Sequence, residues 1–332
     1  MVSAALALLV AFFVGGALTR LGPRLGFVDL PDDFLKPHTG AVVPLGGVAI
    51  FAAIHVALAA AGRFDPGLFA ASGMLLVLGL ADDRVGLSPR LRLAVQVAAG
   101  VVLALGSDLD ALPGGMRSLA IGVVFVVVTV NAVNLLDGLD GLAGSTALVT
   151  AAGTAVLAAS RGLDTTFGLI LVAALAGFLV WNWPPARLFL GDNGAYTVAV
   201  FLVYGILSAT LPSTETLGLV AFALLGVFAI DLAVTLLRRA LGRRPLFTGD
   251  RSHVYDQLRD RGWPVPRINA TFAVAQASIV AVVVVIDRLL APWTRIGAVA
   301  VVLAAAVAAL GMVGFLRPDS GVVDPTTGPP DT

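Results

Sequence analysis

Residues 118–160 read SLAIGVVFVVVTVNAVNLLDGLDGLAGSTALVTAAGTAVLAAS, and this stretch decides the fold. Two apolar runs, 118–136 and 142–160, flank a short polar segment. Each run is close to the roughly 20 apolar residues that a helix needs to cross about 30 Å of hydrocarbon. A membrane interior offers no water to pair backbone groups, so such runs predict helices and not strands. The stretch therefore predicts two membrane-spanning helices joined by a polar turn.

Similar apolar runs cover most of the chain. Of its 332 residues 58% are hydrophobic and only 13% are charged, whereas a soluble domain carries about 25% charged residues. Eleven candidate spans lie at about 2–19, 43–61, 67–81, 92–106, 118–136, 142–160, 166–182, 194–211, 217–237, 270–287 and 294–316. The first lacks a basic start and leads into further spans, so we expect a retained helix and not a signal peptide. We expect an all-α, polytopic membrane bundle that forms one domain over residues 1–316, with a disordered cytoplasmic tail at 317–332.

The charged residues predict the orientation of this bundle. If the N-terminus faces outward, sixteen of the 21 Lys and Arg residues fall in inner loops and five in outer loops, as the positive-inside rule requires. The predicted location is the inner (plasma) membrane, with the C-terminus in the cytoplasm. The formal net charge is zero, so nothing favours a nucleic-acid partner. The chain has no cysteine, which excludes disulfides and thiolate metal sites.

Acidic residues on the predicted inner face occur beside glycines and asparagines. Acidic residues on the predicted outer face do not. The inner set is Asp32, Asp33, Asp82, Asp83, Asp137, Asp140, Asp192, Asp250, Asp256 and Asp260. The most specific element of this set is NAVNLLDGLDGLAGS, in which Asn131, Asn134, Asp137 and Asp140 recur every three residues. Positions three apart share one face of a helix, so the first three side chains would project together. A helix cap followed by a turn is the plain alternative, but a turn needs one such residue and not four.

Three other acidic positions are less specific. Adjacent carboxylates at Asp82 and Asp83 repel unless a cation lies between them, and a solvated loop is an equal alternative. Asp192 lies at the predicted start of a span, where free N–H groups suit a phosphate, or where the residue acts as a simple N-cap. Asp231 lies inside the ninth predicted span, about 9 Å from its inner end at 1.5 Å per residue. For Asp231, a structural ion pair and a role in the site both stay open.

The longest inner loop reads RRALGRRPLFTGDRSHVYDQLRDRGWP and is strongly basic. Arginine suits phosphate oxygens through bidentate contacts, which makes Arg251 a candidate ligand of phosphate. A solvated positive-inside loop explains the charge of this segment but not its GDRSH element. His55, in the second predicted span, is interpreted as a packed core histidine.

Five segments in order resemble the polyprenyl-phosphate N-acetylhexosamine-1-phosphate transferases, or glycosyltransferase family 4. They are VDLPDDFLKPHTGAVVPLGGVAIF, which contains Lys36 and His38; ADDRVGLSPRLRLAVQ; NAVNLLDGLDGLAG; FLGDNGAY; and Asp231 to Arg238 with GDRSH. The resemblance covers nearly the whole chain. It departs in the last inner loop, where the family usually has two or three clustered histidines and this chain has only His253. Tyr255 and Asp256 take the neighbouring places, which argues against the branch that uses UDP-MurNAc-pentapeptide.

The resemblance implies a reaction between a UDP-N-acetylhexosamine and polyprenyl (undecaprenyl) phosphate, with release of UMP. It would be the first membrane step of cell-wall or surface polysaccharide synthesis. It implies Mg²⁺, or Mn²⁺, on Asp192 with Asp82 or Asp83 as further ligands. Asp82, Asp83, Asp137, Asp140 and His253 are the expected catalytic residues. The expected substrate-binding residues are Lys36, His38, Asn131, Asn134, Asp231, Arg251 and Tyr255, with His253 and Arg251 on phosphate.

Two points of this interpretation stay open. Asp82 resembles a residue proposed as a base, but a phosphate monoester with its second pKa near 6 offers little proton to remove at pH 7. GlcNAc is the expected sugar, with another UDP-HexNAc or UDP-MurNAc-pentapeptide as alternatives. A secondary transporter is the distant alternative, because transporters usually place their site at mid-membrane between repeated halves and no repeat is visible here. The sequence leaves open whether the protein forms a homodimer.

Overall fold

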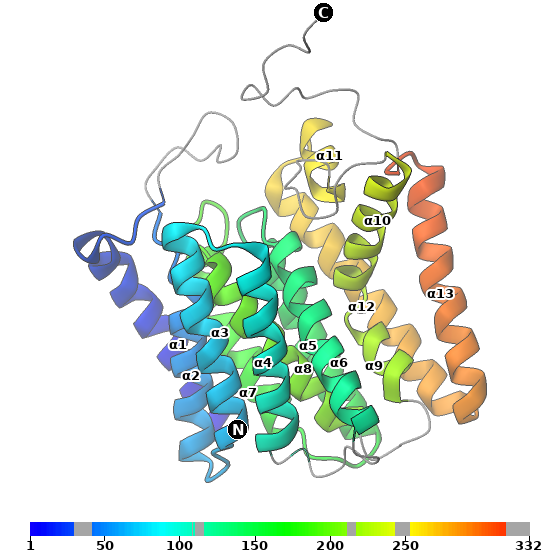
Figure 1. The fold of residues 1–332 in the computed structure, drawn as a ribbon, viewed down its shortest axis with the longest axis horizontal. Coiled ribbons are helices and arrows are strands. Elements are labelled where there is room, and N and C mark those ends of the chain that lie inside the picture. Colours follow the sequence, from blue (N-terminus) through cyan, green and yellow to red (C-terminus); the bar gives the residue numbers. More distant parts are fainter. Residues whose placement is uncertain (30–41, 108, 110–115, 211–216, 243–252, 317–332) are drawn as a thin grey trace, which may run out of the picture.

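The computed structural model describes residues 1–29, 42–107, 109, 116–210, 217–242 and 253–316. Thirteen α-helices lie in these ranges, and two isolated bridges are their only strand-like pairings. The helices are α1 (Val2–Leu21), α2 (Gly46–Ala60), α3 (Pro66–Val85), α4 (Pro89–Gly106), α5 (Met116–Leu136), α6 (Leu142–Ser160), α7 (Thr166–Asn182), α8 (Gly191–Thr210), α9 (Leu217–Leu224), α10 (Val227–Leu241), α11 (Val254–Asp260), α12 (Val265–Leu289) and α13 (Pro292–Met312). A short 3-10 helix, η1 (Gly22–Leu25), follows α1. The predicted all-α membrane bundle is confirmed (Figure 1).

Each predicted span coincides with a helix, with one correction. Seven helices in the described ranges are long and apolar enough to cross a membrane, and α2 and α7 are shorter apolar helices. The ninth predicted span, 217–237, is not continuous: it breaks into α9 and α10 at Leu225 and Gly226. The sequence also missed α11, because its seven residues, VYDQLRD, are too few to show an apolar period between two long spans. The predicted tail, 317–332, lies outside the described residues.

Helix α8 forms the centre of the bundle, and helices α2, α3, α5 and α6 pack around it. Within its apolar window 89% of the residues are buried, against 17% for α1 and 6% for α13. The first turn of α8 lies against two glycines. A Cβ on Gly79 of α3 would approach the Cα of Asn193 to 2.2 Å, and one on Gly47 of α2 would approach the Asn193 backbone to 2.6 Å. These glycines allow three helices to meet at the start of α8.

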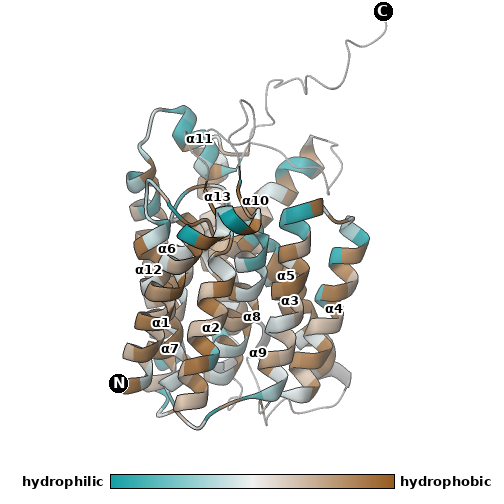
Figure 2. Ribbon diagram, turned by 90° about the vertical axis from the view of Figure 1, so that its left-hand side faces the viewer, coloured by the Kyte–Doolittle hydropathy of each residue, from teal (hydrophilic) through white to brown (hydrophobic). Residues whose placement is uncertain are grey.

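The two ends of the bundle differ in chemistry. Hydrophilic residues gather at the end where α11 lies, which we call the α11 end, and the N-terminus lies at the opposite end (Figures 1 and 2). Helices α3 and α5 finish at the α11 end, and α8 begins there. At the opposite end Arg161, which follows α6, connects α6 with α8 and α12. Its guanidinium binds Asp287 of α12 at 2.5 and 2.9 Å and donates to the carbonyl of Ala209 at 2.9 Å.

Candidate active site

The site is built around the first turn of α8. A helix start leaves its first N–H groups without backbone partners. Here Asp83 of α3 accepts from the N–H of Asp192 at 2.9 Å and from that of Asn193 at 3.1 Å. The carboxylate of Asp137 accepts from the N–H of Gly191. Two carboxylates therefore occupy the N–H groups that the sequence offered to phosphate, and they fasten α3 and the turn after α5 to α8.

Asp82 and Asp83 are adjacent, but they have separate partners. Asp82 accepts from the Tyr196 hydroxyl at 2.6 Å, from the N–H of Leu87 at 2.7 Å and from Arg92 at 3.3 Å. Each carboxylate is therefore met by its own donors, which offset part of the repulsion between the two. Whether either residue binds metal stays a prediction.

Asn134 and Asp192 meet at the centre of the site. The amide of Asn134 donates to Asp192 Oδ1 at 2.5 Å. Asp137, in the turn after α5, is close enough for charge repulsion with Asp192, Asp83 and Asp140. Burial first, and then these negative charges, raise the pKa of the Asp137 carboxyl well above its usual value. The predicted gathering of Asn134, Asp137, Asp192 and the paired aspartates is therefore present in the structure.

The two other members of the three-residue repeat point elsewhere. Asn131 donates to Gln96 of α4 at 2.9 Å and to its own helix at Val127. Asp140 accepts from the N–H of Ala186 at 2.9 Å, which anchors the loop between α7 and α8. The backbone carbonyl of Asp140 accepts from Asn269 of α12 at 2.8 Å. Both residues join helices around the site, and their contact with substrate stays a prediction.

A second group of polar side chains connects α10 with the segment that leads into α11. The carboxylate of Asp231 lies 2.9 Å from Nδ1 of His253, and the Thr235 hydroxyl lies 3.3 Å from the same atom. Asp231 and His253 are both buried, and Oδ1 of Asp231 has no hydrogen-bond partner among the described residues. A buried carboxylate oxygen without a donor is costly. Asp231 is therefore suited to receive a donor from a bound molecule.

Tyr255 connects this group to the first turn after α5. Its ring stacks on His253 with centroids 5.2 Å apart and planes 8° apart. Its hydroxyl donates to the carbonyl of Leu135 at 3.1 Å. The ring also lies directly over Gly138, where a Cβ would approach the Tyr255 hydroxyl to 2.1 Å. The residue in place of a family histidine thus packs on the segment that carries Asp137.

Sequence reasoning missed several polar residues that shape the site. Tyr196 holds Asp82, Asn182 accepts from the N–H of Gly141 at 3.0 Å, and Asn269 holds Asp140. Each is a polar side chain within or beside an apolar helix, and this feature of the sequence could have identified it as a candidate for the site. Lys36, His38 and Arg251, all predicted to bind substrate, lie outside the described residues.

The residues around Asp192 suit a hard cation. No group of three or more His, Cys, Asp or Glu side chains with metal-binding geometry occurs within the described ranges. Mg²⁺, however, often takes only one or two carboxylates and completes its shell with water and substrate phosphate. Asp192 is half-buried, and its neighbours Asn134 and Asp137 supply only oxygen and amide groups. The donor set fits a hard cation such as Mg²⁺, and binding of this ion stays a prediction.

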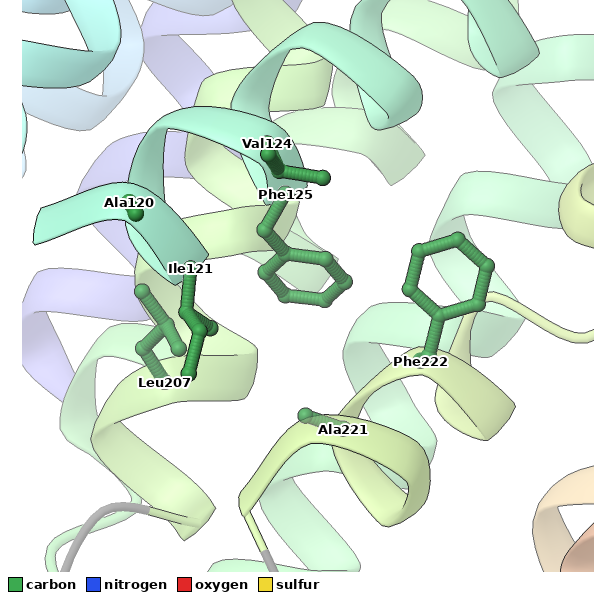
Figure 3. Close-up of a pocket in the computed structure, with 7 residues that line it drawn as sticks. All are labelled: Ala120, Ile121, Val124, Phe125, Leu207, Ala221 and Phe222. Carbon is green, nitrogen blue, oxygen red and sulfur yellow. The ribbon is translucent and has the colours of Figure 1, made fainter. Parts of the chain in front are cut away.

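An apolar pocket opens between α5, α8 and α9 on the opposite side of the α9–α10 break from Asp231. It measures about 280 Å³. Its lining is Ala120, Ile121, Val124, Phe125, Leu207, Ala221 and Phe222 (Figure 3). The rings of Phe125 and Phe222 lie 5.7 Å apart. A pocket with this lining suits a hydrocarbon chain and not a charged group.

Comparison with known proteins agrees with this arrangement. The family model of glycosyl transferase family 4 matches residues 66–210, which run from α3 to α8. A protein of Streptomyces coelicolor that is named as a glycosyltransferase is 32% identical over 95% of this chain and 76% of its own length. The chain belongs to glycosyl transferase family 4. The predicted family is therefore confirmed, and the chain is a transferase.

Other members of the family have more specific names. The undecaprenyl-phosphate alpha-N-acetylglucosaminyl 1-phosphate transferase of Thermotoga maritima is 31% identical over 74% of this chain and 78% of its own length. The decaprenyl-phosphate N-acetylglucosaminephosphotransferase of Mycobacterium tuberculosis is 28% identical over 77% of this chain and 74% of its own. The residues matched by the family model include Asp82, Asp83, Asn134, Asp137 and Asp192. The centre of the site therefore lies in the part of the chain that defines the family.

Proposed function

We propose that this family 4 transferase moves N-acetylhexosamine 1-phosphate from a UDP-sugar to polyprenyl phosphate. An oxygen of the lipid phosphate attacks the β-phosphorus, the bond from that phosphorus to the bridging oxygen breaks, and UMP leaves. The observation that carries the proposal is the meeting of Asn134, Asp137 and Asp192 at one end of an apolar bundle. A lipid head group and a water-soluble nucleotide can meet only at such a surface.

Asp192 is the proposed ligand of Mg²⁺ or Mn²⁺, with Asn134 beside it. The ion would neutralise phosphate charge, which is the main requirement of phosphoryl transfer together with positioning. Asn134 fixes the carboxylate of Asp192 through its 2.5 Å hydrogen bond. Asp83 and Asp137 fix the backbone of the same turn. The chain's own residues thus hold Asp192 in one orientation before substrate arrives.

Asp82 is proposed as a positioning residue and not as a base. Its two oxygens already accept from Tyr196, Leu87 and Arg92. The lipid phosphate, with its second pKa near 6, is mostly dianionic at pH 7 and needs no base to lose a proton. Asp82 therefore ties the end of α3 to Tyr196 of α8, which supports the neighbouring Asp83.

The apolar pocket lies toward the other end of α5 and α8 from Asn134 and Asp192, so it is proposed to take the far part of the lipid tail and not the head group. The apolar pocket lined by Phe125 and Phe222 supports a polyprenyl tail between α5 and α9 (Figure 3). His253, with Arg251 in the undescribed segment, is proposed to hold nucleotide phosphate. In the proposed orientation, the protein lies in the plasma membrane and its α11 end faces the cytoplasm. UDP-sugars are made in the cytoplasm. GlcNAc is the proposed sugar, because it appears in the names of the Thermotoga and Mycobacterium relatives.

The test is an assay on purified protein in lipid nanodiscs. UDP-GlcNAc labelled in the sugar is incubated with undecaprenyl phosphate and Mg²⁺, and label is measured in the organic phase. The proposal expects lipid label that requires both the lipid and the metal. A panel of UDP-HexNAc donors and UDP-MurNAc-pentapeptide identifies the sugar. No lipid label from any donor would refute the transferase reaction.

A further inference from the structure

Helices α9 and α10 form a broken helix within the apolar part of the bundle. Helix α9 ends at Leu224 and α10 begins at Val227, and Gly226 between them has φ 45° and ψ −109°. A break of this kind interrupts the backbone hydrogen bonds of a helix. In a membrane interior no water can pair the groups that are released. The break therefore needs partners from the protein.

Gln276 of α12 supplies these partners on both sides of the break. Its side-chain oxygen accepts from the N–H of Val227 at 2.8 Å. Its amide nitrogen donates to the carbonyl of Leu224 at 2.9 Å and to the hydroxyl of Thr150 on α6 at 2.9 Å. A glutamine amide has one oxygen and two N–H donors, so all three are used. The side chain is completely buried.

Gly226 is fitted to the same side chain. A Cβ at this position would approach the oxygen of Gln276 to 2.4 Å. The positive φ of Gly226 also disfavours any residue with a side chain. Neither partner of this contact can be enlarged without moving the other. The direction in which the chain turns between α9 and α10 is therefore set by Gly226 and Gln276 together.

The apolar pocket and the Asp231–His253 pair lie on opposite sides of the break. On the α9 side, Ala221 and Phe222 line the apolar pocket. On the α10 side, Asp231 lies in the first turns of the helix and binds His253. A change in the turn would thus move one wall of the pocket relative to the Asp231–His253 pair.

We propose that Gln276 is a positioning residue. It fixes the angle between α9 and α10, and so fixes the position of the pocket wall relative to Asp231 that the reaction requires. This inference rests on the proposed function. A purely structural role, in which Gln276 only satisfies backbone groups, is the competing explanation. The two differ in whether the folded Gln276 variant works normally.

The kinetic test compares Gln276→Leu with Thr154→Val. Leucine has a similar size but no polar atoms. Thr154 is a buried residue one turn along α6, and its hydroxyl donates to the carbonyl of Thr150 in its own helix. For equal amounts of folded protein, Gln276→Leu is expected to lower kcat/KM for polyprenyl phosphate about tenfold, because a shift of the pocket wall and of Asp231 misplaces the groups that bind substrate. Thr154→Val should match wild type. In Gln276→Glu, the carboxyl group is expected to stay protonated in the apolar interior, so it keeps one acceptor and one donor. This variant should be much more active than Gln276→Leu.

A double-mutant cycle with Asp231→Asn tests whether Gln276 affects the reaction through Asp231. If Gln276 acts through Asp231, Gln276→Leu should have little further effect on kcat in the Asp231→Asn background. Fully additive losses, or normal kcat and KM in the folded fraction of Gln276→Leu, would overturn the inference. Gly226→Ala, which pushes on Gln276 from the other side, should reproduce the kinetic change if Gln276→Leu cannot be purified.

A distance measurement tests the same inference without activity. The chain has no cysteine, so Val85→Cys on α3 and Leu241→Cys on α10, both exposed, carry two unique spin labels. Gln276→Leu is expected to shift or broaden the distance distribution between them, and Thr154→Val is not. An unchanged distribution would overturn the inference. If wild type makes no lipid product, the proposed function fails, while this measurement still decides the role of Gln276.

Discussion

The amide of Asn134 donates a 2.5 Å hydrogen bond to the carboxylate of Asp192, although the two residues are 58 positions apart in the chain. Asn134 lies in the last turn of α5, and Asp192 lies in the first turn of α8. In the proposed metal site, the second oxygen of Asp192 would bind the cation, and this hydrogen bond would fix the direction of the carboxylate. The proposed metal site depends on this contact.

Substitution of Asp192 and substitution of Asn134 should therefore both impair metal-dependent activity, but by different amounts. Asp192→Asn removes the charged ligand and is expected to lower the rate by at least about 100-fold, because a bound metal contributes several kcal/mol to transition-state stabilisation. Asn134→Ala removes only the orienting bond and should raise the Mg²⁺ concentration needed for half-maximal rate by about tenfold or more. A magnesium titration of the nanodisc assay measures both. Equal, metal-independent losses in the two variants would contradict the assignment.

Asp82→Asn is expected to lower turnover by only about tenfold, the effect of weakening a hydrogen bond at a buried carboxylate. Tyr196→Phe removes the 2.6 Å bond to the same carboxylate and should cause a loss of similar size. The rate against pH should keep its shape in both variants. A general base would instead give a far larger loss in Asp82→Asn and remove the acidic limb of the profile.

Gly138→Ala should damage the site, because a methyl group at this position meets the side chain of Tyr255. The new methyl would approach the Tyr255 hydroxyl to 2.1 Å, so the tyrosine ring and the stacked His253 must move. We expect activity to fall by about tenfold or more, since small displacements of positioning groups are costly. Tyr255→Phe keeps the ring and loses one hydrogen bond to Leu135, and should retain most of the activity. Gly73→Ala is the control, because a Cβ there also causes no backbone strain and comes no closer than 3.9 Å to its nearest neighbour, the ring of Phe51.

The pH dependence of stability can be checked at the opposite end of the bundle. Partial burial raises the pKa of Asp164, but hydrogen bonds from Thr166 and the charge of Arg63 outweigh it and lower the pKa below the ordinary 3.8. A lowered carboxyl pKa stabilises the fold above the ordinary value, and this contribution is lost as pH falls through the lowered pKa. Because the pair is about half exposed, Asp164→Asn should cost at most about 1 kcal/mol at pH 7.

Thermal unfolding in detergent at several pH values measures this contribution. The difference between wild type and Asp164→Asn should shrink toward zero as the pH falls below 3.8. Transferase activity at pH 7 should not change, because the residue lies far from the α11 end. A difference that grows as the pH falls would have the wrong sign for an ionised, paired aspartate.

Much of the fold and of the site's centre could be predicted from the sequence. Apolar runs located the helices, because burial in lipid leaves few alternatives to a helix. The repeat from Asn131 to Asp140 located the site, because polar groups are costly in a membrane without a function. Side-chain partners could not be predicted in this way. That Asp83 caps α8 and Asp140 holds Ala186 depends on contacts between distant segments.

The broken ninth span was missed for a similar reason. Residues 221–230 read AFALLGVFAI, which is apolar throughout and suits a continuous helix. The break is stabilised by Gln276 of α12, about 50 residues away, and the sequence around this glutamine gave no sign of its partners. Tyr255 was recognised as a departure from the family, but its packing on Gly138 required the structure.

The central claim, attack of a lipid phosphate on the β-phosphorus, is tested most directly by a double-label experiment. UDP-GlcNAc carrying ³²P in the β-phosphate and ³H in the sugar is incubated with undecaprenyl phosphate, Mg²⁺ and the purified enzyme, and both labels are counted in the lipid product. The account predicts that ³²P and ³H enter the lipid in equal amounts, while the released nucleotide is unlabelled UMP. Lipid that carries ³H without ³²P, with labelled UDP in the water phase, would contradict it.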